Sequence, residues 1–380
     1  MKIQQLHLCD NQWTSAYTTS QFDPHDAQLV LAFGDPLLIQ SKDHIKEIKD
    51  RYPSADIIYA SGAGEIIDER VCDNSIVATA IQFDKTKTKA EITNVNHHAN
   101  SRDTGNYLME KLSAEDLKFV FVISDGIHIN GSELVQGLNE KNHLNVPITG
   151  GLAGDGTRFS KTYVGLNTTP EEGMIVAVGF YGAHLSIGHG SFGGWDEFGP
   201  ERIITKSSKN VLHEIDHKNA LDLYKEYLGP YKEELPGSAL LFPLSIKEPG
   251  SEKTLVRTIL TVNEEEKSML FAGNMTEGSK VRLMKANFDK LIEGSSIAAQ
   301  NCFAGVSNES PDLAIFISCV GRKIILQDRT DEEVEAAKKI FNNNPPIAGF
   351  YSYGEISPFN PNTKCELHNQ TMTITTLTEV

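Results

Sequence analysis

Apolar and polar positions follow one order in three separate stretches of the chain. The stretches cover residues 29–66, 119–156 and 313–356, and the first is the faintest copy. Each opens with an apolar, β-branched run typical of a strand, continues with a helical pattern, and returns to apolar residues before a glycine-rich turn. In the second and third stretches Asp155 or Glu355 closes that turn. A fourth stretch, beginning at Ala239, has a strand and a glycine-rich end but no convincing helix.

Repetition of strand–helix–strand units predicts the fold class. Such units form α/β proteins, in which helices cover the sheets. We therefore expect an α/β fold of duplicated units with mixed sheets, arranged in two pseudo-equivalent halves. The polar segment 194–210, with its glycine and proline residues, is the best junction between the halves. It divides the chain into an N-terminal domain, residues 1–209, and a C-terminal domain, residues 210–380.

Several elements have clear local signals. Thr330 and Glu333 form the T-x-x-E pattern of a capping box, which predicts the start of a helix. Asn219 can cap a second helix, which the Gly-Pro pair at residues 229–230 ends. The run 173–192 is rich in β-branched residues with glycine breaks, and it predicts a strand or a hairpin.

Composition and charge exclude several classes of partner. The chain has 380 residues, of which 39% are hydrophobic and 23% charged, with a formal net charge of −16. Such an acidic chain repels nucleic acid and anionic membrane surfaces, so we expect neither as a partner. The apolar runs are strand-sized and the N-terminus lacks the apolar core of a signal peptide, so we expect a cytoplasmic protein. The five cysteines form no C-x-x-C pair, which favours free thiols.

The glycine-rich segment "VPITGGLAGDG" (residues 146–156) raises the question of a phosphate site. It lacks the Gly-Lys-Ser/Thr of a Walker loop, and no helix is predicted after it. We therefore expect its glycines, among them Gly151 and Gly154, to permit a tight connection and close backbone approach. The turn would also bring backbone N–H groups and a carboxylate, Asp155 or Glu355, to the end of a sheet. That arrangement suits a small polar ligand with an amine or a hydroxyl group.

Six motifs occur in order along the chain: "PITGGLAGDG", "EIDHKNALDLYKEYLG", "LPGSALLFPL", "ISCVGRKIILQ", "AGFYSYGEI" and "LHNQTMTI". Over nearly its whole length the sequence resembles the FIST family, with an N-terminal followed by a C-terminal FIST domain. The resemblance implies a sensory, non-enzymatic protein of bacterial-type signal transduction that binds a small ligand such as an amino acid. Some stand-alone members of similar length bind haem and sense nitric oxide. The sequence contains no kinase segment, so the resemblance implies output through a separate protein such as a histidine kinase.

Polar residues near two predicted strand ends are the candidate ligand contacts. Cys319 and Arg322 follow a strand, where ligands bind in open α/β sheets, and Arg322 could pair with a carboxylate. The alternative is a buried thiol beside a surface arginine. Around one predicted hairpin further on, polar residues could line a cleft or form a solvated face, and the resemblance favours the cleft. The expected ligand-binding set is Gly151, Gly154, Asp155, Cys319, Arg322, Tyr353, Glu355, His368 and Asn369.

Two other chemistries stay open. "HEIDH" (residues 213–217) matches the H-E-x-x-H pattern of a zinc hydrolase, but its context predicts a strand and a turn rather than the helix that zinc binding needs. A hydrolase using Cys319, or His213, Glu214 and His217, is therefore an alternative rather than the expectation. Haem is a possible cofactor and would need an axial histidine in an apolar pocket. His184 and His189 lie beside apolar residues, although a strand histidine is more often structural.

Overall fold

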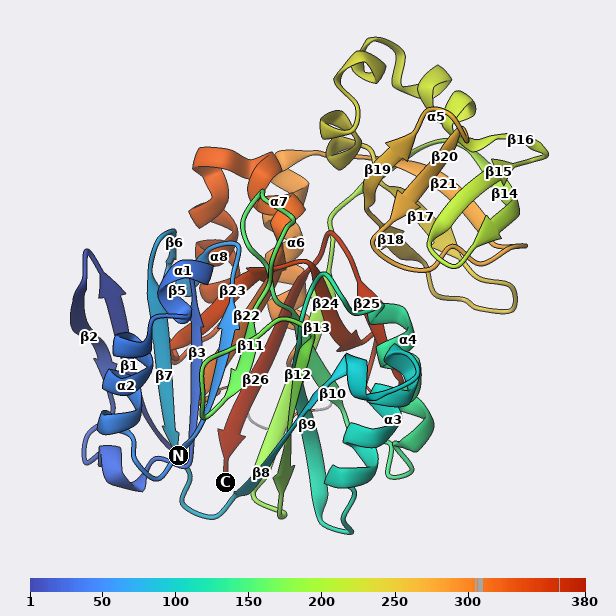
Figure 1. The fold of residues 1–380 in the computed structure, drawn as a ribbon. Coiled ribbons are helices and arrows are strands. Elements are labelled where there is room, and N and C mark those ends of the chain that lie inside the picture. Colours follow the sequence, from blue (N-terminus) through green and yellow to red (C-terminus); the bar gives the residue numbers. More distant parts are fainter. Residues whose placement is uncertain (305, 307–309, 362) are drawn as a thin grey trace.

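The computed structural model describes residues 1–304, 306, 310–361 and 363–380. Three six-stranded sheets form a body, and a separate β-rich module stands at one corner of it (Figure 1). The predicted α/β class with mixed sheets is confirmed. The body contains three related units rather than two halves, and each unit corresponds to one of the repeated stretches of the sequence.

Each sheet of the body is centred on one unit. The first has the order β11-β4-β3-β7-β1-β2, the second β25-β24-β10-β9-β12-β8, and the third β13-β26-β22-β23-β5-β6. The strands of the first sheet are β1 (Lys2–Cys9), β2 (Gln12–Thr18), β3 (Leu29–Gly34), β4 (Asp56–Ser61), β7 (Ile76–Gln82) and β11 (Val164–Leu166). Those of the second are β8 (Lys87–Asn94), β9 (Leu117–Ser124), β10 (Ile148–Leu152), β12 (Met174–Tyr181), β24 (Gly354–Pro358) and β25 (Cys365–His368). Those of the third are β5 (Glu65–Ile67), β6 (Arg70–Cys72), β13 (Leu185–Phe192), β22 (Leu313–Cys319), β23 (Ile347–Ser352) and β26 (Met372–Glu379).

The three units exchange strands in a ring. Within each unit the first two strands are parallel: β3 with β4, β9 with β10, and β22 with β23. The chain then leaves its own sheet and pairs with the second strand of another unit. Thus β5 of the first unit pairs with β23, β24 of the third with β10, and β11 of the second with β4. Every sheet therefore contains at least one strand from a neighbouring unit.

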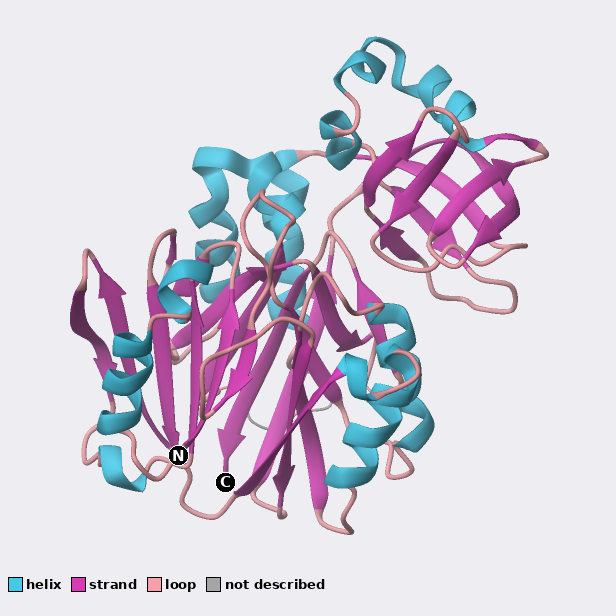
Figure 2. Ribbon diagram, in the orientation of Figure 1, coloured by secondary structure: helices cyan, strands magenta, loops and turns pink. Residues whose placement is uncertain are grey.

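Helices cover the outer faces of the sheets (Figure 2). They are α1 (Pro36–Ile39), α2 (Lys42–Arg51), α3 (Ser101–Leu112), α4 (Gly131–Lys141), α6 (Phe288–Asn301), α7 (Val320–Leu326) and α8 (Thr330–Lys338), with short 3-10 turns at Pro24–Asp26, Val95–His97 and Gln327–Arg329. Strand alternation explains the layers, because successive side chains point to opposite faces. In β3, Phe33 joins a central core shared by all three sheets, whereas Val30 packs on the side of α2. No helix in the described residues is both long and apolar enough to cross a membrane.

The module is an insertion between β13 and α6. Its strands are β14 (Asp196–Ser208), β15 (Val211–Ile215), β16 (Lys218–Asn219), β17 (Leu244–Lys247), β18 (Leu255–Arg257), β19 (Ile259–Asn263), β20 (Ser268–Phe271) and β21 (Lys280–Lys285), in the order β18-β17-β21-β14-β15-β20-β19, with β16 beside β15. The module also contains helix α5 (Ala220–Leu228) and the 3-10 turns Gly229–Glu234 and Gly237–Leu241. It has an apolar core of its own. The division of the chain between residues 209 and 210 falls between β14 and β15 and stays a prediction.

Local sequence signals predicted where helices and strands occur more reliably than they predicted the contacts of individual residues. Helix α5 begins after Asn219, whose side chain accepts from the Asp222 N–H at 3.3 Å, as predicted. Helix α8 forms, but the capping box is wrong, because the cap position is Arg329 and Glu333 turns inward to other partners. The segment predicted as a junction is mostly the long strand β14.

One predicted hairpin is absent, and a run predicted as a strand or a hairpin forms strands that do not pair with each other. The run 173–192 folds as β12 and β13, which lie in different sheets, so it is two strands without mutual pairing. Likewise β25 and β26 belong to different sheets, and Gln370 between them has a φ of +61°. The predicted hairpin near His368 is therefore two strands of different sheets, joined by a turn.

Candidate functional site

A cavity of about 660 Å³ lies between the body and the module. We call it the interlobe cleft, where the two lobes are the body and the module. The body contributes residues 126–130, Leu152, Phe159, residues 319–321 and Tyr353, and the module contributes Asn210, Pro236, Gly237, Leu240, residues 258–261 and residues 270–273. Small-molecule sites commonly occupy such apolar cavities between domains. A bound molecule would contact both lobes at once.

Exposed apolar side chains from both lobes face this cleft. Ile127 and Phe159 of the body are 39% and 43% exposed, and Leu260 of the module is 43% exposed. Exposing large apolar side chains to water is unfavourable, and a cluster of them marks a surface that binds something. The cleft therefore favours a ligand with a substantial apolar part.

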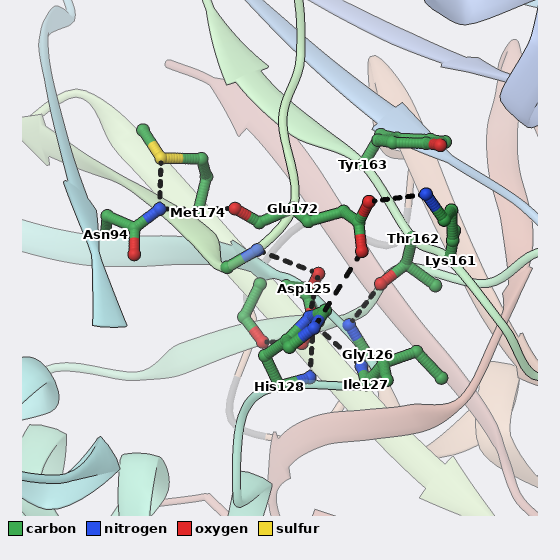
Figure 3. A network of polar contacts seen from close by, with 12 residues as sticks. Asn94, Asp125, Gly126, Ile127, His128, Lys161, Thr162, Tyr163, Glu172 and Met174 are labelled. Carbon is green, nitrogen blue, oxygen red and sulfur yellow. Dashed lines mark hydrogen bonds and ion pairs between the residues drawn. The ribbon is translucent and has the colours of Figure 1, made fainter. Parts of the chain in front are cut away.

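A buried carboxylate shapes the body wall of the cleft (Figure 3). Asp125 follows β9, and its Oδ1 accepts from the backbone N–H groups of Ile127 at 2.7 Å and His128 at 2.6 Å. Its Oδ2 accepts from the Gly173 N–H at 3.0 Å. The Gly126 N–H donates to the Thr162 hydroxyl at 2.9 Å. These bonds hold the turn 126–128 in place, which presents Ile127 to the cleft.

Tyr353 forms a second ordered part of the wall. Its hydroxyl donates to Asp155 and accepts from the Phe159 N–H at 3.2 Å, and its ring stacks on Phe159 with centroids 4.7 Å apart. Asp155 also accepts from the backbone N–H groups of Ser160 at 3.0 Å and Lys161 at 2.9 Å. Asp155 thus orders the loop that carries Phe159 and does not itself line the cleft.

Polar groups are few on the cleft surface. Thr258, on the module, has a buried hydroxyl with no hydrogen-bond partner in the part of the chain that is described. Burying a hydroxyl without a partner is unfavourable, so this oxygen is a natural anchor for a ligand group. The thiol of Cys319 lies on the opposite wall, where burial raises its pKa. That direction opposes the thiolate a nucleophile requires.

The module is fastened to the body beside the cleft. Arg257 of the module donates to the Leu367 carbonyl of β25 at 2.9 Å, and burial lowers its pKa to about 10. Asn130 donates to the side chain of Asn274 at 3.2 Å. Lys209 and Glu133 form an ion pair at 2.9 Å. These contacts, together with the two chain segments that connect the module to the body, hold the two walls of the cleft next to each other.

Arg322 was expected to contact a ligand, but the structure gives it other partners. It is fully buried and pairs with Glu333 of α8, with Nη2 and Oε2 2.8 Å apart. Its remaining N–H groups donate to the carbonyls of Gly193 at 2.5 Å, Leu291 at 2.7 Å and Gln370 at 3.4 Å. Its donors are thus engaged in joining segments of the protein.

Glu355 lies in the interior behind Cys319. Its Oε1 accepts from Ser352 at 2.8 Å, and its Oε2 accepts from the Thr371 hydroxyl at 2.8 Å and N–H at 3.2 Å. Burial is the main cause that raises the pKa of Glu355 to about 8. The Cys319 N–H donates to the Thr371 carbonyl at 3.1 Å, so Glu355 supports the wall of the cleft without facing it.

The other expected contacts are buried as well. His368 is close to the Ser357 carbonyl, at 3.0 Å from Nε2, and burial lowers its pKa to about 4. Asn369 is 1% exposed, and its Oδ1 has no partner within the described residues. Gly151 and Gly154 lie where strands approach closely, and a Cβ at Gly154 would be 3.1 Å from that of Ala63. Of the expected set, Cys319 and Tyr353 line the cleft, and their contact with a ligand stays a prediction.

The H-E-x-x-H segment has the predicted strand and turn. His213 lies on β15, whereas His217 has a φ of +59° in the turn that follows. The two imidazoles are therefore not one helical turn apart, which zinc coordination by this motif requires. No cluster of three or more His, Cys, Asp or Glu residues suited to a metal occurs among the described residues.

The histidines do not fit an axial haem ligand in the cleft. His184, near Val380, and His189, in β13, lie outside the cleft lining, and burial lowers the pKa of His189 to about 4. His128 does line the cleft, but its Nδ1 is 3.3 Å from the Asp125 carboxylate and its Nε2 3.8 Å from Glu172 (Figure 3). Both ring nitrogens face carboxylates rather than an apolar wall.

Sequence reasoning missed the whole module wall and the turn 126–128. The signal for the turn was present, because Asp-Gly directly after a buried strand is a turn pattern, and Asp125 stands at the end of β9 as Cys319 does at the end of β22. The module residues carried no comparable signal. Their role depends on how the module lies against the body.

The structure is that of an α/β protein with a cavity between its body and its module. The sequence matches the FIST N domain over residues 28–218 and the FIST C domain over residues 220–358, and the chain belongs to the FIST family. FIST domains are sensory, ligand-binding domains of signal-transduction proteins. The curated proteins with which the sequence was compared include no match.

Proposed function

We propose that the interlobe cleft is the sensory site and binds a small organic molecule with a large apolar part. The observation that carries the proposal is that residues of both lobes line one cavity of about 660 Å³ and expose apolar side chains into it. A ligand that contacts both lobes favours the arrangement in which both contacts form, and so shifts the population of conformers. A separate signalling protein, such as a histidine kinase, reads that shift. An amino acid with an apolar side chain meets these requirements.

Haem-based sensing of nitric oxide is the alternative that the resemblance implies. We do not place haem in the cleft, because the lining histidine has both ring nitrogens beside carboxylates. Purified protein supplied with haem should therefore show no Soret band that moves when nitric oxide is added. If such a band appears, haem rather than an apolar metabolite is the ligand.

Filling the cleft tests the proposal. A metabolite library is screened by thermal shift against the wild type, Ile127→Trp and Leu260→Trp, which enlarge one side chain on each wall. Both side chains are partly exposed, so we expect the unliganded stability to change by less than about 0.5 kcal/mol. A compound at a hundred times its Kd stabilises the wild type by about 2.7 kcal/mol. Both variants should lose that shift.

Leu37→Trp is the matched control. Leu37 is 79% exposed on α1 and lies outside the cleft lining, so this variant should respond as the wild type does. Small-angle scattering with a hit compound should show a smaller radius of gyration for the wild type and none of this change for Ile127→Trp. A compound whose thermal shift survives in both filled variants binds elsewhere and overturns the proposal.

A further inference from the structure

A second cavity, of about 540 Å³, lies within the body and is lined by segments of all three units. The turn 62–65 after β4, residues 156–158, and Lys323 of α7 contribute to its wall. Val320 lines both this cavity and the interlobe cleft, so a single turn of α7 separates them. The lining is more polar than that of the cleft and includes the ionisable side chains of Asp35, Glu65, Asp73, Arg158 and Lys323.

Comparing the three units singles out Glu65. The first, second and third units place Glu65, Asp155 and Glu355 at corresponding positions, shortly after β4, β10 and β23. Asp155 accepts two backbone N–H groups and the Tyr353 hydroxyl. Glu355 has hydrogen-bond donors on both of its oxygens. Two of the three acids are therefore satisfied by the protein itself.

Glu65 differs because one of its oxygens is unpartnered. Its Oε2 accepts from the Ser75 hydroxyl at 3.0 Å, but its Oε1 has no hydrogen-bond partner anywhere in the described residues. The residue is 1% exposed and lines the cavity. A buried acceptor without a donor is unfavourable, and such an acceptor on a cavity wall is a site where a ligand donor is stabilised.

The neighbouring charges leave this acceptor available. Lys323 donates to the Ala63 carbonyl at 3.0 Å and to Asp73, so its ammonium group is already engaged. Asp35 accepts from the Leu37 N–H at 2.8 Å and has its other oxygen 3.7 Å from Arg158. Arg158 is also 3.9 Å from Asp155, so the two basic groups are matched by three carboxylates other than Glu65.

The protonation state of Glu65 depends on its surroundings. Burial raises its pKa to about 8, the Ser75 hydrogen bond and Lys323 oppose that shift, and Asp35 and Asp73 add to it. Cys72 on β6 lies directly opposite Glu65 on β5. Burial raises the pKa of Cys72, and the nearby Glu65 raises it further. Without a cation beside it, these surroundings favour the protonated form of Glu65 near neutral pH. A cation at Oε1 would favour the carboxylate form.

We propose that this cavity is a second ligand site, for a small molecule with a primary ammonium group that donates to Glu65 Oε1. The acidic chain, with a net charge of −16, favours cationic ligands in general. Binding at this site is separate from binding in the cleft, because Glu65 and Lys323 line only the second cavity.

Calorimetric titration of the full chain with 1,4-diaminobutane tests this site. We expect Glu65→Gln to weaken binding at least tenfold, because an amide cannot form the charged pair. Glu69→Gln is the matched control, since Glu69 lies in the turn after β5, its side chain is 49% exposed, and it does not line the cavity. Butan-1-ol and butyrate, which lack the ammonium group, should not bind. Ile127→Trp, which fills the cleft, should bind the diamine as the wild type does.

The wild type alone provides an independent readout. Ionising Glu65 on binding releases a proton, so the affinity should rise by about ninefold from pH 6 to pH 7 and by about fivefold from pH 7 to pH 8, where the pKa of the free site is reached. The measured enthalpy should also change with the ionisation enthalpy of the buffer. Absence of diamine binding, equal binding by Glu65→Gln, or an affinity independent of pH would each overturn the proposal. Loss of diamine binding in Ile127→Trp would place the amine in the cleft instead.

Discussion

Replacing Arg322 with methionine removes the guanidinium group that joins four segments of the body. In the wild type it pairs with Glu333 and donates to the carbonyls of Gly193, Leu291 and Gln370. Methionine retains the apolar stem to about the position of Nε, so the change removes the charge, the hydrogen bonds and the volume of the terminal guanidinium group. We expect a large loss of stability rather than a selective loss of ligand binding.

The size of the loss follows from these contacts. Removing one partner of a buried ion pair costs about 3–5 kcal/mol. The carbonyls of Gly193 and Leu291 lose this donor, at about 1–3 kcal/mol each if no water replaces it. The Gln370 carbonyl still accepts from Trp195 Nε1 at 2.9 Å. Because neighbouring effects are not additive, we expect a total of about 4–8 kcal/mol, against a typical stability of about 5–15 kcal/mol.

Urea unfolding followed by circular dichroism measures the loss. The double variant Arg322→Met/Glu333→Gln should be more stable than Arg322→Met, because it no longer buries an unpaired carboxylate. Arg329→Met is the control, since Arg329 forms partly exposed pairs with Asp289 and Glu332 and should cost less than about 1 kcal/mol. The reasoning is refuted if Arg322→Met keeps its stability while losing the thermal shift of a cleft ligand.

Two further predictions concern single side chains. Glu355 holds its proton in the folded protein to about pH 8, whereas in the unfolded chain it releases it near its ordinary value of 4.5, so stability should fall as the pH rises between those values. In Glu355→Gln the decline in urea midpoint from pH 5 to pH 8 should be smaller than in the wild type, and an identical decline would contradict the assignment. His217 has a φ of +59° in a turn, where glycine is free of steric cost, so His217→Gly should raise the stability by about 0.5–1 kcal/mol. A thermal melt showing a lower midpoint would disprove this, and metal analysis should find no zinc in either form.

Local sequence patterns predicted the elements but not the pairing between units. The apolar runs and helical patterns correctly indicated β9, β22, α5 and α8, because these depend on neighbours in the sequence. The exchange of strands depends on contacts far apart in the chain, such as Glu65 opposite Phe350. Periodicity describes which face of a strand is apolar and carries no information about which sheet the strand joins.

The candidate site was predictable to a smaller extent. Cys319 was selected because it stands at the end of a predicted strand, where sites gather. Tyr353 was selected because it lies near a predicted hairpin for which the family resemblance favours a cleft. The same reasoning selected Arg322, but its charge is taken up by Glu333, which the capping pattern had assigned to the start of a helix. Glu65 lies in the faintest copy of the repeat, so its acid was not compared with Asp155 and Glu355. What distinguishes it is an unpartnered oxygen, which only the packed structure reveals.

Because the three units exchange strands in a ring, the body cannot be divided into separate folded pieces. A fragment ending after β23 would lack β24, and the second sheet would then expose the backbone of β10 where β24 now pairs. The module, by contrast, begins and ends at the body and contains its own apolar core, so its removal interrupts none of the three sheets. We therefore expect the fold to tolerate alteration in the module, which supplies one wall of the cleft. The three-unit body should tolerate no loss of a strand.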